Sequence, residues 1–588
     1  MNKVRQIARD FLFLFNPYWQ YGKLLVVLTI VGAIIAAPVG QIASATIAQV
    51  VIDNVLAEQP LSAIIQTVIL YFAVWAASYL VQNGVQDFYR GWKTEYISTR
   101  IKEIVFEQAL RTDFRWIDDP QYFNQLSLTI NNYANSSKNT MATMVQLLTG
   151  IATAVAMLAV IAQIGWPITL IIVIGSLLSI VIQSKMVAFQ MNLMPEHMEL
   201  QRKMDYATRV YQQNNYAADL KSTKIADIIG KRFNVNAKVF VNFARKLQIK
   251  LGYYAVGSAW SAKIADYCVI LYVALGLLNG QIKSVGEYAT IIAAAAVLSS
   301  SLSTLSFIFP QITQITQSAN IIRGFFNLES KIETAGGILP PENKFEIDFN
   351  DVKFTYPNNP DFAMNGITFS IAEGEKIAIV GENGAGKTTL TKLILRLYDT
   401  DSGEILINKK NVKEYDVKAL RLKIGVAFQH SNIYAATLAE NLQLYNNANS
   451  VQLCEALKNN GLVDLINNID SDVTKEFDAN GLVLSGGQIQ KLSLARLNCG
   501  NFGLLLLDEP SSALDPIAEY ELTRQIFNRA NATTTIMVAH RLSTIRHADR
   551  ILVVDGGKIA EVGTHDELMS LDGKYAEMFT KQAENYTP

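Results

Sequence analysis

Cysteine is scarce in this sequence of 588 residues, which contains only Cys268, Cys454 and Cys499. The three are far apart and form neither a CxxC nor a Cys/His pattern. This excludes a disulfide framework and gives no indication of a zinc site. Charged residues are also few, at 18 %, whereas 50 % of the residues are hydrophobic. Such a composition excludes a disordered chain.

The formal charge of −1 hides two unlike parts of the chain. Residues 1–330 contain 26 Lys/Arg and 18 Asp/Glu, a net charge of +8, whereas residues 331–588 contain 25 Lys/Arg and 34 Asp/Glu, a net charge of −9. The second part also has the higher density of charged residues. An asymmetry of this kind predicts separate domains of different character rather than one uniform globular domain.

The first part contains apolar runs long enough to cross a bilayer, which takes about 20 residues. Six such spans are predicted, at 25–52, 62–83, 141–163, 167–190, 253–278 and 285–318. The first contains Pro38 and Gly40, which membrane helices tolerate. The alternative is six buried helices of a soluble bundle, but the runs are too long and too weakly amphipathic for that.

Basic residues are concentrated before the first span and in the segments 84–140 and 191–252, whereas the other connecting segments hold only Lys283. By the positive-inside rule, the N-terminus, both long loops and the C-terminal half face the cytoplasm. Residues 1–24 mix aromatic and basic residues, which predicts a helix lying on the membrane surface. Each long loop is predicted to be a helical hairpin. Its tip, near 118–124 or 214–221, is a candidate for docking on another domain.

The pattern changes after residue 330, where two glycines and two prolines in 331–344 are typical of a linker. Short β-branched runs then alternate with helical stretches, as in an α/β domain. The predicted fold is therefore a six-helix membrane domain with long cytoplasmic extensions, followed by an α/β P-loop domain. The predicted boundaries are 1–24 for the surface helix, 25–325 for the membrane domain, 326–344 for the linker and 345–588 for the nucleotide-binding domain.

A phosphate-binding loop is predicted at 381–389, because GENGAGKTT follows a strand-like run and precedes a helical one. Its backbone N–H groups would surround phosphate oxygens, with Lys387 at the β- and γ-phosphates and the Thr388 hydroxyl on Mg²⁺. The residues of this loop are Gly381, Glu382, Asn383, Gly384, Ala385, Gly386, Lys387, Thr388 and Thr389.

LLLLDEP at 504–510 predicts a strand buried on both faces that ends in two carboxylates. We expect Asp508 to hold Mg²⁺ and Glu509 to act as general base toward the attacking water. On its own this pattern is also typical of an ordinary strand end. A third motif, LSGGQ at 484–488, predicts a phosphate-binding turn at a helix N-terminus. It contains Ser485, Gly486, Gly487 and Gln488.

Together the three motifs resemble the ATPase domain of ABC transporters. In that family the LSGGQ turn binds the γ-phosphate of ATP held by the other subunit, so the resemblance implies two ATP molecules between two domains. Further matches imply that Tyr356 stacks on adenine, Gln429 contacts Mg²⁺ and water, Asp515 touches the opposite subunit and His540 contacts the γ-phosphate. Taken singly, each of these four is also explained by ordinary packing or capping.

The whole chain resembles a half-transporter of the exporter type, with ATP and Mg²⁺ as cofactors and ATP hydrolysis as its activity. One ATPase domain cannot complete a shared site, so the resemblance implies a dimer, and the intact Glu509, His540 and LSGGQ favour a homodimer over a heterodimer. It also implies a multi-pass protein in the bilayer of the bacterial cytoplasmic membrane. The six spans exclude a soluble ABC factor acting on ribosomes or nucleic acid.

The substrate is less well determined by the sequence. DEPSSALDPIAE at 508–519 resembles exporters of lantibiotics and related bacterial peptides, so a peptide is the first expectation. A lipid or hydrophobic-drug exporter is the alternative, and an ATP-driven regulatory module without transport is a remote one. One departure from the family pattern is TKEFDANG at 474–481, where exporters often carry an acidic-Gly-Glu-Arg-Gly stretch that contacts the membrane loops.

Two charged residues, Lys263 and Asp266, lie in the middle of the fifth span, next to Trp260. A charge at a helix centre costs about 2.5–3.5 kcal/mol on insertion scales, so it is expected to face a partner or a wet cavity. The three residues are therefore candidates for a substrate cavity, with a structural ion pair as the alternative. In the sixth span, Ser299, Ser300, Ser301 and Ser303 predict close packing or a cavity wall, and Gln311, Gln314 and Gln317 predict a wet face.

Overall fold

A computed structural model describes the chain except for residues 1, 163–165, 280–283, 333–335, 343, 358, 360, 430, 511–518, 520–523, 525–532, 540 and 585–588. The chain forms two compact units. The first comprises residues 1–110 and 123–328, and the second comprises residues 111–122 and 329–588. Residues 118–122 of the first loop tip thus belong to the same unit as the C-terminal half.

Six helical segments of the chain are long and apolar enough to cross a membrane, which confirms the six predicted spans. The helix α10 has 54 residues, or about 80 Å at roughly 1.5 Å per residue, far more than the ~30 Å of a bilayer core. The bounds are α1 (Asn2–Tyr21), α2 (Lys23–Val31), η1 (Gly32–Ala36), α3 (Ala37–Leu56), α4 (Leu61–Tyr79), η2 (Leu80–Arg90), α5 (Gly91–Arg111), α7 (Pro120–Ala162), α8 (Trp166–Gln212), η3 (Asn214–Tyr216), α9 (Ala217–Ser222), α10 (Ile225–Leu278) and α11 (Val285–Phe326).

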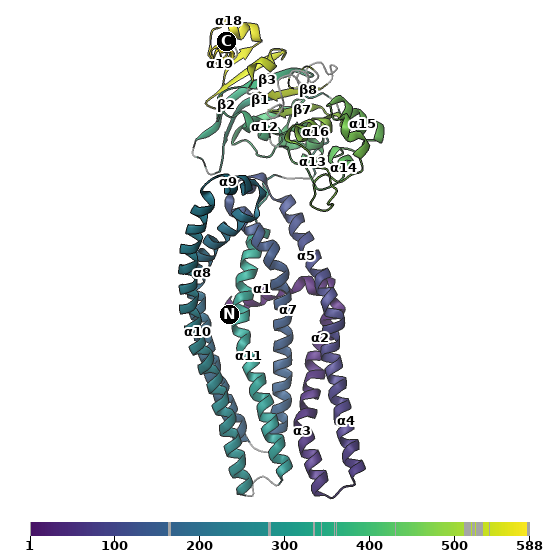
Figure 1. Ribbon diagram of the computed structural model, residues 1–588, viewed down its shortest axis with the longest axis vertical. Helices are drawn as coiled ribbons and strands as arrows, with labels where there is room; N and C mark the ends of the chain where they lie inside the picture. The colour runs from purple at the N-terminus through teal and green to yellow at the C-terminus, as the bar shows by residue number, and fades with distance from the viewer. Residues whose placement is uncertain are drawn as a thin grey trace. The chain divides into compact units, whose positions relative to one another are not determined.

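Close helix packing in the first unit depends on small residues. Figure 1 shows α8 and α10 running side by side. A Cβ atom on Gly175 would lie 2.5 Å from the Cβ of Ala265, so only glycine allows this approach. The hydroxyls of Ser179 and Ser258 are 2.6 Å apart across the same pair of helices. A buried apolar cluster drawn from α3, α7, α8, α10 and α11 forms the core beside them.

An ion pair between Asp10 and Arg323 links α1 to α11. Asp10 is fully buried, and its carboxylate accepts a hydrogen bond from the Arg323 guanidinium. Arg323 also donates to the Arg9 carbonyl oxygen at 2.8 Å and lies over the Phe13 ring, 4.8 Å from its centroid. Because the buried carboxylate needs a compensating charge, this pair fixes where α1 meets the end of α11.

The second unit is built on two sheets, which confirms the α/β prediction. The larger has the order β10-β9-β3-β8-β7-β6, in which all neighbours are parallel except β10 and β9; the smaller, β2-β1-β4-β5, is antiparallel. The strands are β1 (Ile347–Thr355), β2 (Phe362–Ile371), β3 (Lys376–Val380), β4 (Ser402–Ile407), β5 (Lys410–Asn411), β6 (Ile424–Ala427), β7 (Leu504–Asp508), β8 (Thr534–Val538), β9 (Arg550–Asp555) and β10 (Lys558–Gly563).

The helices α14, α15 and α16 lie on one side of this unit (Figure 1), and α16 also packs against β6 of the larger sheet. They pack around their own apolar cluster, which includes Leu438, Leu457 and Leu492. The helices of the unit are α6 (Phe114–Ile117), α12 (Lys387–Ile394), η4 (Val412–Glu414), α13 (Val417–Leu422), α14 (Leu438–Leu442), α15 (Ser450–Asn459), η5 (Val463–Asn468), α16 (Gly486–Asn498), η6 (Leu542–Ile545), α18 (His565–Ser570) and α19 (Lys574–Glu584).

Replacing Asp10 with Ala is expected to destabilise the first unit. Removing one partner of a buried ion pair leaves the other charge uncompensated, at a cost of about 3 kcal/mol. Unfolding in detergent micelles, followed by circular dichroism against a denaturant, measures this loss. The matched control is Glu577→Ala, which breaks the exposed pair with Lys581 and should change stability by about 0–1 kcal/mol. Equal losses in both variants would contradict the role given to Asp10.

Candidate functional site

The phosphate-binding loop connects β3 to α12, as the sequence predicts. Gly381 and Gly386 have φ angles of +153° and +109°, which glycine adopts without strain. A Cβ on Gly381 would lie 2.1 Å from the Val554 carbonyl oxygen, and one on Gly386 would lie 2.1 Å from the Met364 side chain. Neither of these two positions therefore has room for a side chain. At Gly384, by contrast, a Cβ would meet no atom within 4 Å.

Lys387 is the first residue of α12 and folds back over this loop. Its ammonium group donates to the carbonyl oxygens of Gly381 and Glu382, at 2.8 and 2.9 Å. Burial lowers the pKa of Lys387, and the carboxylates of Glu509 and Asp508 act in the opposite direction. A polyphosphate at the loop would favour the charged lysine further, because an anion nearby stabilises the ammonium form. The cradle and the lysine thus fit a nucleotide phosphate chain.

Asp508 and Glu509 lie at the carboxyl end of β7, next to the carboxyl end of β6. The strands are parallel, with Ala427 paired to Leu507, so Gln429 and Glu509 come next to each other two residues farther on. The side-chain amide of Gln429 donates to Glu509 at 2.9 Å. Asp508 is 5 % exposed and pairs with Val538 of β8. The edge formed by the carboxyl ends of parallel strands is where α/β sheets bind their ligands.

A magnesium ion bound with phosphates needs only one or two protein ligands. The predicted ligands are the exposed hydroxyl of Thr388 at the start of α12, together with Asp508 and Gln429. Within the described ranges, no group of three or more His, Cys, Asp or Glu residues could hold a metal by itself. The predicted site combines one hydroxyl, one carboxylate and one amide, a set that fits a metal arriving with a nucleotide.

The LSGGQ turn begins α16. Ser485 is the N-cap residue: its hydroxyl accepts from the Gln488 N–H at 3.3 Å, and the Gln488 side chain accepts from the Ser485 N–H at 2.9 Å. This capping box holds the turn open at the helix N-terminus. Ser485 and Gly486 are exposed, so the turn is available to a phosphate brought by another molecule, as the resemblance implies.

Tyr356 follows β1 and lies beside α12, since its hydroxyl is 3.1 Å from that of Thr389. This places the predicted adenine-stacking residue next to the predicted phosphate loop. The predictions for Asp515 and His540 fall outside the described residues. The stretch 474–481 forms a loop closed by the Thr474 N–H to Leu482 carbonyl bond at 2.7 Å, and its Phe477 is 81 % exposed.

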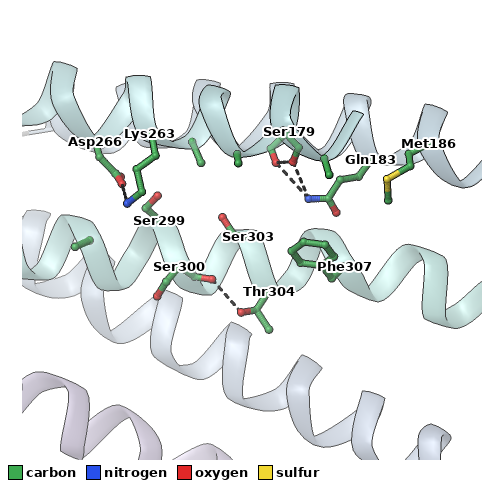
Figure 2. A pocket seen from close by; sticks show the side chains of 15 residues that line it. Ser179, Gln183, Met186, Lys263, Asp266, Ser299, Ser300, Ser303, Thr304 and Phe307 are labelled. Atoms are coloured by element: carbon green, nitrogen blue, oxygen red, sulfur yellow. Dashed lines mark hydrogen bonds and ion pairs between the residues drawn. The ribbon is translucent and has the colours of Figure 1, made fainter. Parts of the chain in front are cut away.

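In the first unit, a cleft of about 430 Å³ lies between α8, α10 and α11. Lys263 and Asp266 line it and form an ion pair at 3.1 Å, with the Lys263 side chain 72 % exposed. Figure 2 shows this pair beside Ser299 of α11. Trp260 is 67 % exposed and is not among the residues that line the cleft. The cleft therefore contains two of the three predicted cavity residues.

Gln183 is a cleft residue that sequence reasoning missed, because a single glutamine near the end of an apolar run gives no signal. It is 3 % exposed, and its amide donates to Ser258 at 3.0 Å and to Ser179 at 3.4 Å. Its carbonyl oxygen accepts no hydrogen bond from the residues that the structure describes. In Figure 2 the amide nitrogen faces Ser179 and the oxygen points away from it. A buried acceptor of this kind calls for a donor from a ligand or a water molecule.

The serines of α11 divide between packing and the cleft. Ser301 is buried and 2.9 Å from the Thr153 hydroxyl, whereas Ser299, Ser300 and Ser303 line the cleft. Two of the three glutamines of the predicted wet face, Gln311 and Gln314, line a second cavity of about 280 Å³ between α11 and α7, whereas Gln317 is exposed and does not line it. There the Gln311 side chain accepts from Thr143 at 2.7 Å, and Gln314 lines the wall.

Several known proteins are similar in sequence to this chain. The ABC transporter family model matches residues 364–512. The ATP-dependent lipid A-core flippase of Alkalilimnicola ehrlichii is 28 % identical over 584 residues, covering 96 % of this chain and 95 % of that protein. The protein of the same name from Psychrobacter arcticus is 35 % identical over 303 residues, 51 % of this chain and 50 % of that protein.

A putative multidrug export ATP-binding/permease protein of Bacillus subtilis is 37 % identical over 237 residues, 40 % of this chain and 41 % of that protein. The matches above 30 % identity thus span about half of those relatives. Among solved structures, a bacterial Atm1-family ABC exporter with ATP bound has a TM-score of 0.77 at 23 % identity, over 94 % of this chain and 98 % of that one. This similarity shows that the chain has the exporter fold over nearly its whole length.

Replacing Glu509 with Gln is expected to keep ATP binding and to lower ATP turnover by at least about 10²-fold, because the amide cannot accept a proton from water. The phosphate release rate and the binding of radiolabelled ATP measure the two quantities on the same preparation. Glu455→Gln, at an exposed position of α15, is the control and should match the wild-type rate. Substantial turnover by Glu509→Gln would remove Glu509 from the role of general base.

Proposed function

We propose that this chain, whose ABC transporter ATPase domain follows six membrane helices in the fold of an exporter half-transporter, uses ATP to move a lipid or a similar amphiphile across the bilayer. The observation that carries this proposal is the cleft in the membrane unit, which is lined by Lys263, Asp266, Gln183 and hydroxyl residues of α11. Relatives named lipid A-core flippase support a lipid. The peptide expected from residues 508–519 has less support from these comparisons.

The working unit in this proposal is a homodimer in the bacterial cytoplasmic membrane. Each chain has one phosphate loop and one exposed LSGGQ turn, so two copies are needed to enclose a nucleotide from both sides. The observed exposure of Ser485 and Gly486 supports this arrangement. Closing two such domains around ATP and releasing them after hydrolysis would supply the alternating motion that an exporter needs.

The residues of the nucleotide site divide the chemical work. Lys387 and the N–H groups at the start of α12 would hold the β- and γ-phosphates, and Mg²⁺ would neutralise the charge that develops on them. Glu509 would accept a proton from the attacking water. Because Gln429 already donates to Glu509 at 2.9 Å, it fixes the carboxylate that the water must approach. Glu509 directly follows β7 and has a left-handed backbone, with φ of +50°.

The charges of the cleft indicate the head group that it would accept. Lys263 is already paired with Asp266, so the pair contributes no net charge. Hydroxyls of α11 and the Gln183 carbonyl add donors and acceptors without charge. A zwitterionic or hydroxyl-rich head group matches this lining, because it can engage both members of the ion pair and donate to the carbonyl oxygen. A polyanionic head group would leave most of its charge without a partner.

Reconstitution tests the function directly. With the protein in liposomes, ATP should increase the fraction of a fluorescently labelled zwitterionic phospholipid that reaches the leaflet opposite the ATPase domain, as measured by chemical quenching of the exposed leaflet. Glu509→Gln liposomes are the control and should show only passive exchange. Uptake of a labelled peptide without lipid movement would replace the lipid with a peptide. If ATP is hydrolysed but neither lipid nor peptide crosses the bilayer, the function would instead be that of a regulatory module without transport.

Lys263→Ala is expected to weaken the response to the lipid, because the head group loses a charged hydrogen-bond partner. A loss of about 1.4 kcal/mol raises the lipid concentration for half-maximal ATPase stimulation about tenfold. Without lipid, the ATPase rate should stay within about twofold of wild type. Lys238→Ala, at an exposed position on the same helix, is the matched control. An unchanged lipid response would make the ion pair purely structural.

A further inference from the structure

Lys392 of α12 lies one turn beyond Thr389, and three aromatic rings surround its ammonium group. The nitrogen is 5.2 Å from the centroid of Tyr356, 5.3 Å from Phe114 and 5.7 Å from Tyr398. The side chain is only 23 % exposed. All four residues belong to the second unit, since Phe114 lies in the segment 111–122. A cation in contact with several ring faces is more strongly held than an exposed lysine.

A carboxylate completes this cluster. Asp118, also in the segment 111–122, lies 3.4 Å from the Lys392 ammonium and accepts a hydrogen bond from the Tyr398 hydroxyl. Burial raises the pKa of Tyr398, and the bond to Asp118 raises it further, so the tyrosine stays protonated and donates at neutral pH. The cluster therefore consists of one cation, one anion and aromatic rings, with its charges balanced.

Two further aromatic rings pack against Tyr356. Phe354 and Tyr398 form T-shaped contacts with it, with centroid distances of 5.0 and 5.5 Å and interplanar angles of 78° and 86°. Its hydroxyl is 3.1 Å from that of Thr389. The ammonium of Lys392 lies over the ring itself. These contacts leave the ring little rotational freedom before any nucleotide binds.

We propose that Lys392 is a positioning residue for the nucleotide base: it fixes the plane of Tyr356 on which adenine stacks, and Asp118 fixes Lys392. This inference rests on the proposed function, because it takes Tyr356 as the ring on which adenine stacks. A cation over one face draws the electron density of the ring toward itself, which favours an electron-rich base on the opposite face. A ring ordered in advance also avoids the entropic cost of ordering it during binding.

The inference gives the segment 111–122 a part in nucleotide affinity. Asp118 and Phe114 supply two of the contacts around Lys392, so displacing the segment would loosen the lysine and, through it, Tyr356. Linkage requires the converse with equal strength: a stacked base must hold the segment more firmly in place. The loop tip that follows α5 and the adenine site would thus be coupled through one ammonium group.

The test uses the full-length protein and compares Lys392→Met, which keeps the apolar stem, with Lys392→Arg, which keeps the charge. We expect Lys392→Met to raise the KM for ATP about five- to tenfold with kcat within about twofold. Lys392→Arg should restore the KM to within about twofold. Asp118→Asn should raise it about threefold. Lys458→Met, at an exposed position of α15, is the control and should not change it.

Inorganic tripolyphosphate, as a competitive inhibitor without a base, separates the base from the phosphate loop. Its inhibition constant should be the same in wild type and Lys392→Met. An equal rise in this constant and in the KM would place the effect in the phosphate loop and overturn the inference. If Lys392→Met does not behave as expected, Tyr356→Ala shows whether the positioning role or the adenine site itself is wrong. If Tyr356→Ala raises the KM for ATP and Lys392→Met does not, only the positioning role is wrong. If Tyr356→Ala leaves the KM unchanged, the proposed adenine site itself is wrong.

Discussion

The parallel register of the large sheet is the constraint on which the nucleotide site depends. Ala427 pairs with Leu507, and Asp508 pairs with Val538, so the residues that follow β6 and β7 meet at one edge. Gln429 can therefore donate to Glu509 although 80 residues separate them in sequence. Both strands are buried, so their backbone N–H and C=O groups must pair with neighbouring strands, and this ladder brings the two strand ends together.

Local groups outweigh the overall charge in this second unit. Residues 331–588 carry a net charge of −9, yet the predicted ligand is a polyanion. The phosphate loop relies on backbone N–H groups and on Lys387, whose pKa burial lowers and the neighbouring carboxylates raise. Lys392, about one turn farther along α12, also depends on local groups. Aromatic rings and one carboxylate surround its ammonium group, and its side chain is only 23 % exposed. Field effects of distant acidic residues are screened, whereas these contacts are not.

The membrane unit illustrates which polar residues a sequence reveals. Lys263 and Asp266 could be identified because a charge in the middle of an apolar span is costly and therefore conspicuous. Gln183 could not, since one amide near the end of a span has an ordinary cost. Only the packing of α8 against α10 shows that its amide nitrogen donates to Ser179 and Ser258, while its carbonyl oxygen accepts no hydrogen bond within the described part of the chain. Trp260 was a candidate only because it lies near the charged pair in sequence, and it does not line the cleft.

The sequence by itself determined the six spans, the α/β domain and the identity of the motif residues, because each depends on local composition: apolar length, strand-like runs and glycines at fixed spacing. The tertiary structure decided which of these residues meet. The register of β6 and β7 places Gln429 beside Glu509. The packing of the segment 111–122 places Asp118, about 275 residues earlier in the chain, beside Lys392. Contacts across such separations arise from the packing of whole elements, and no local pattern encodes them.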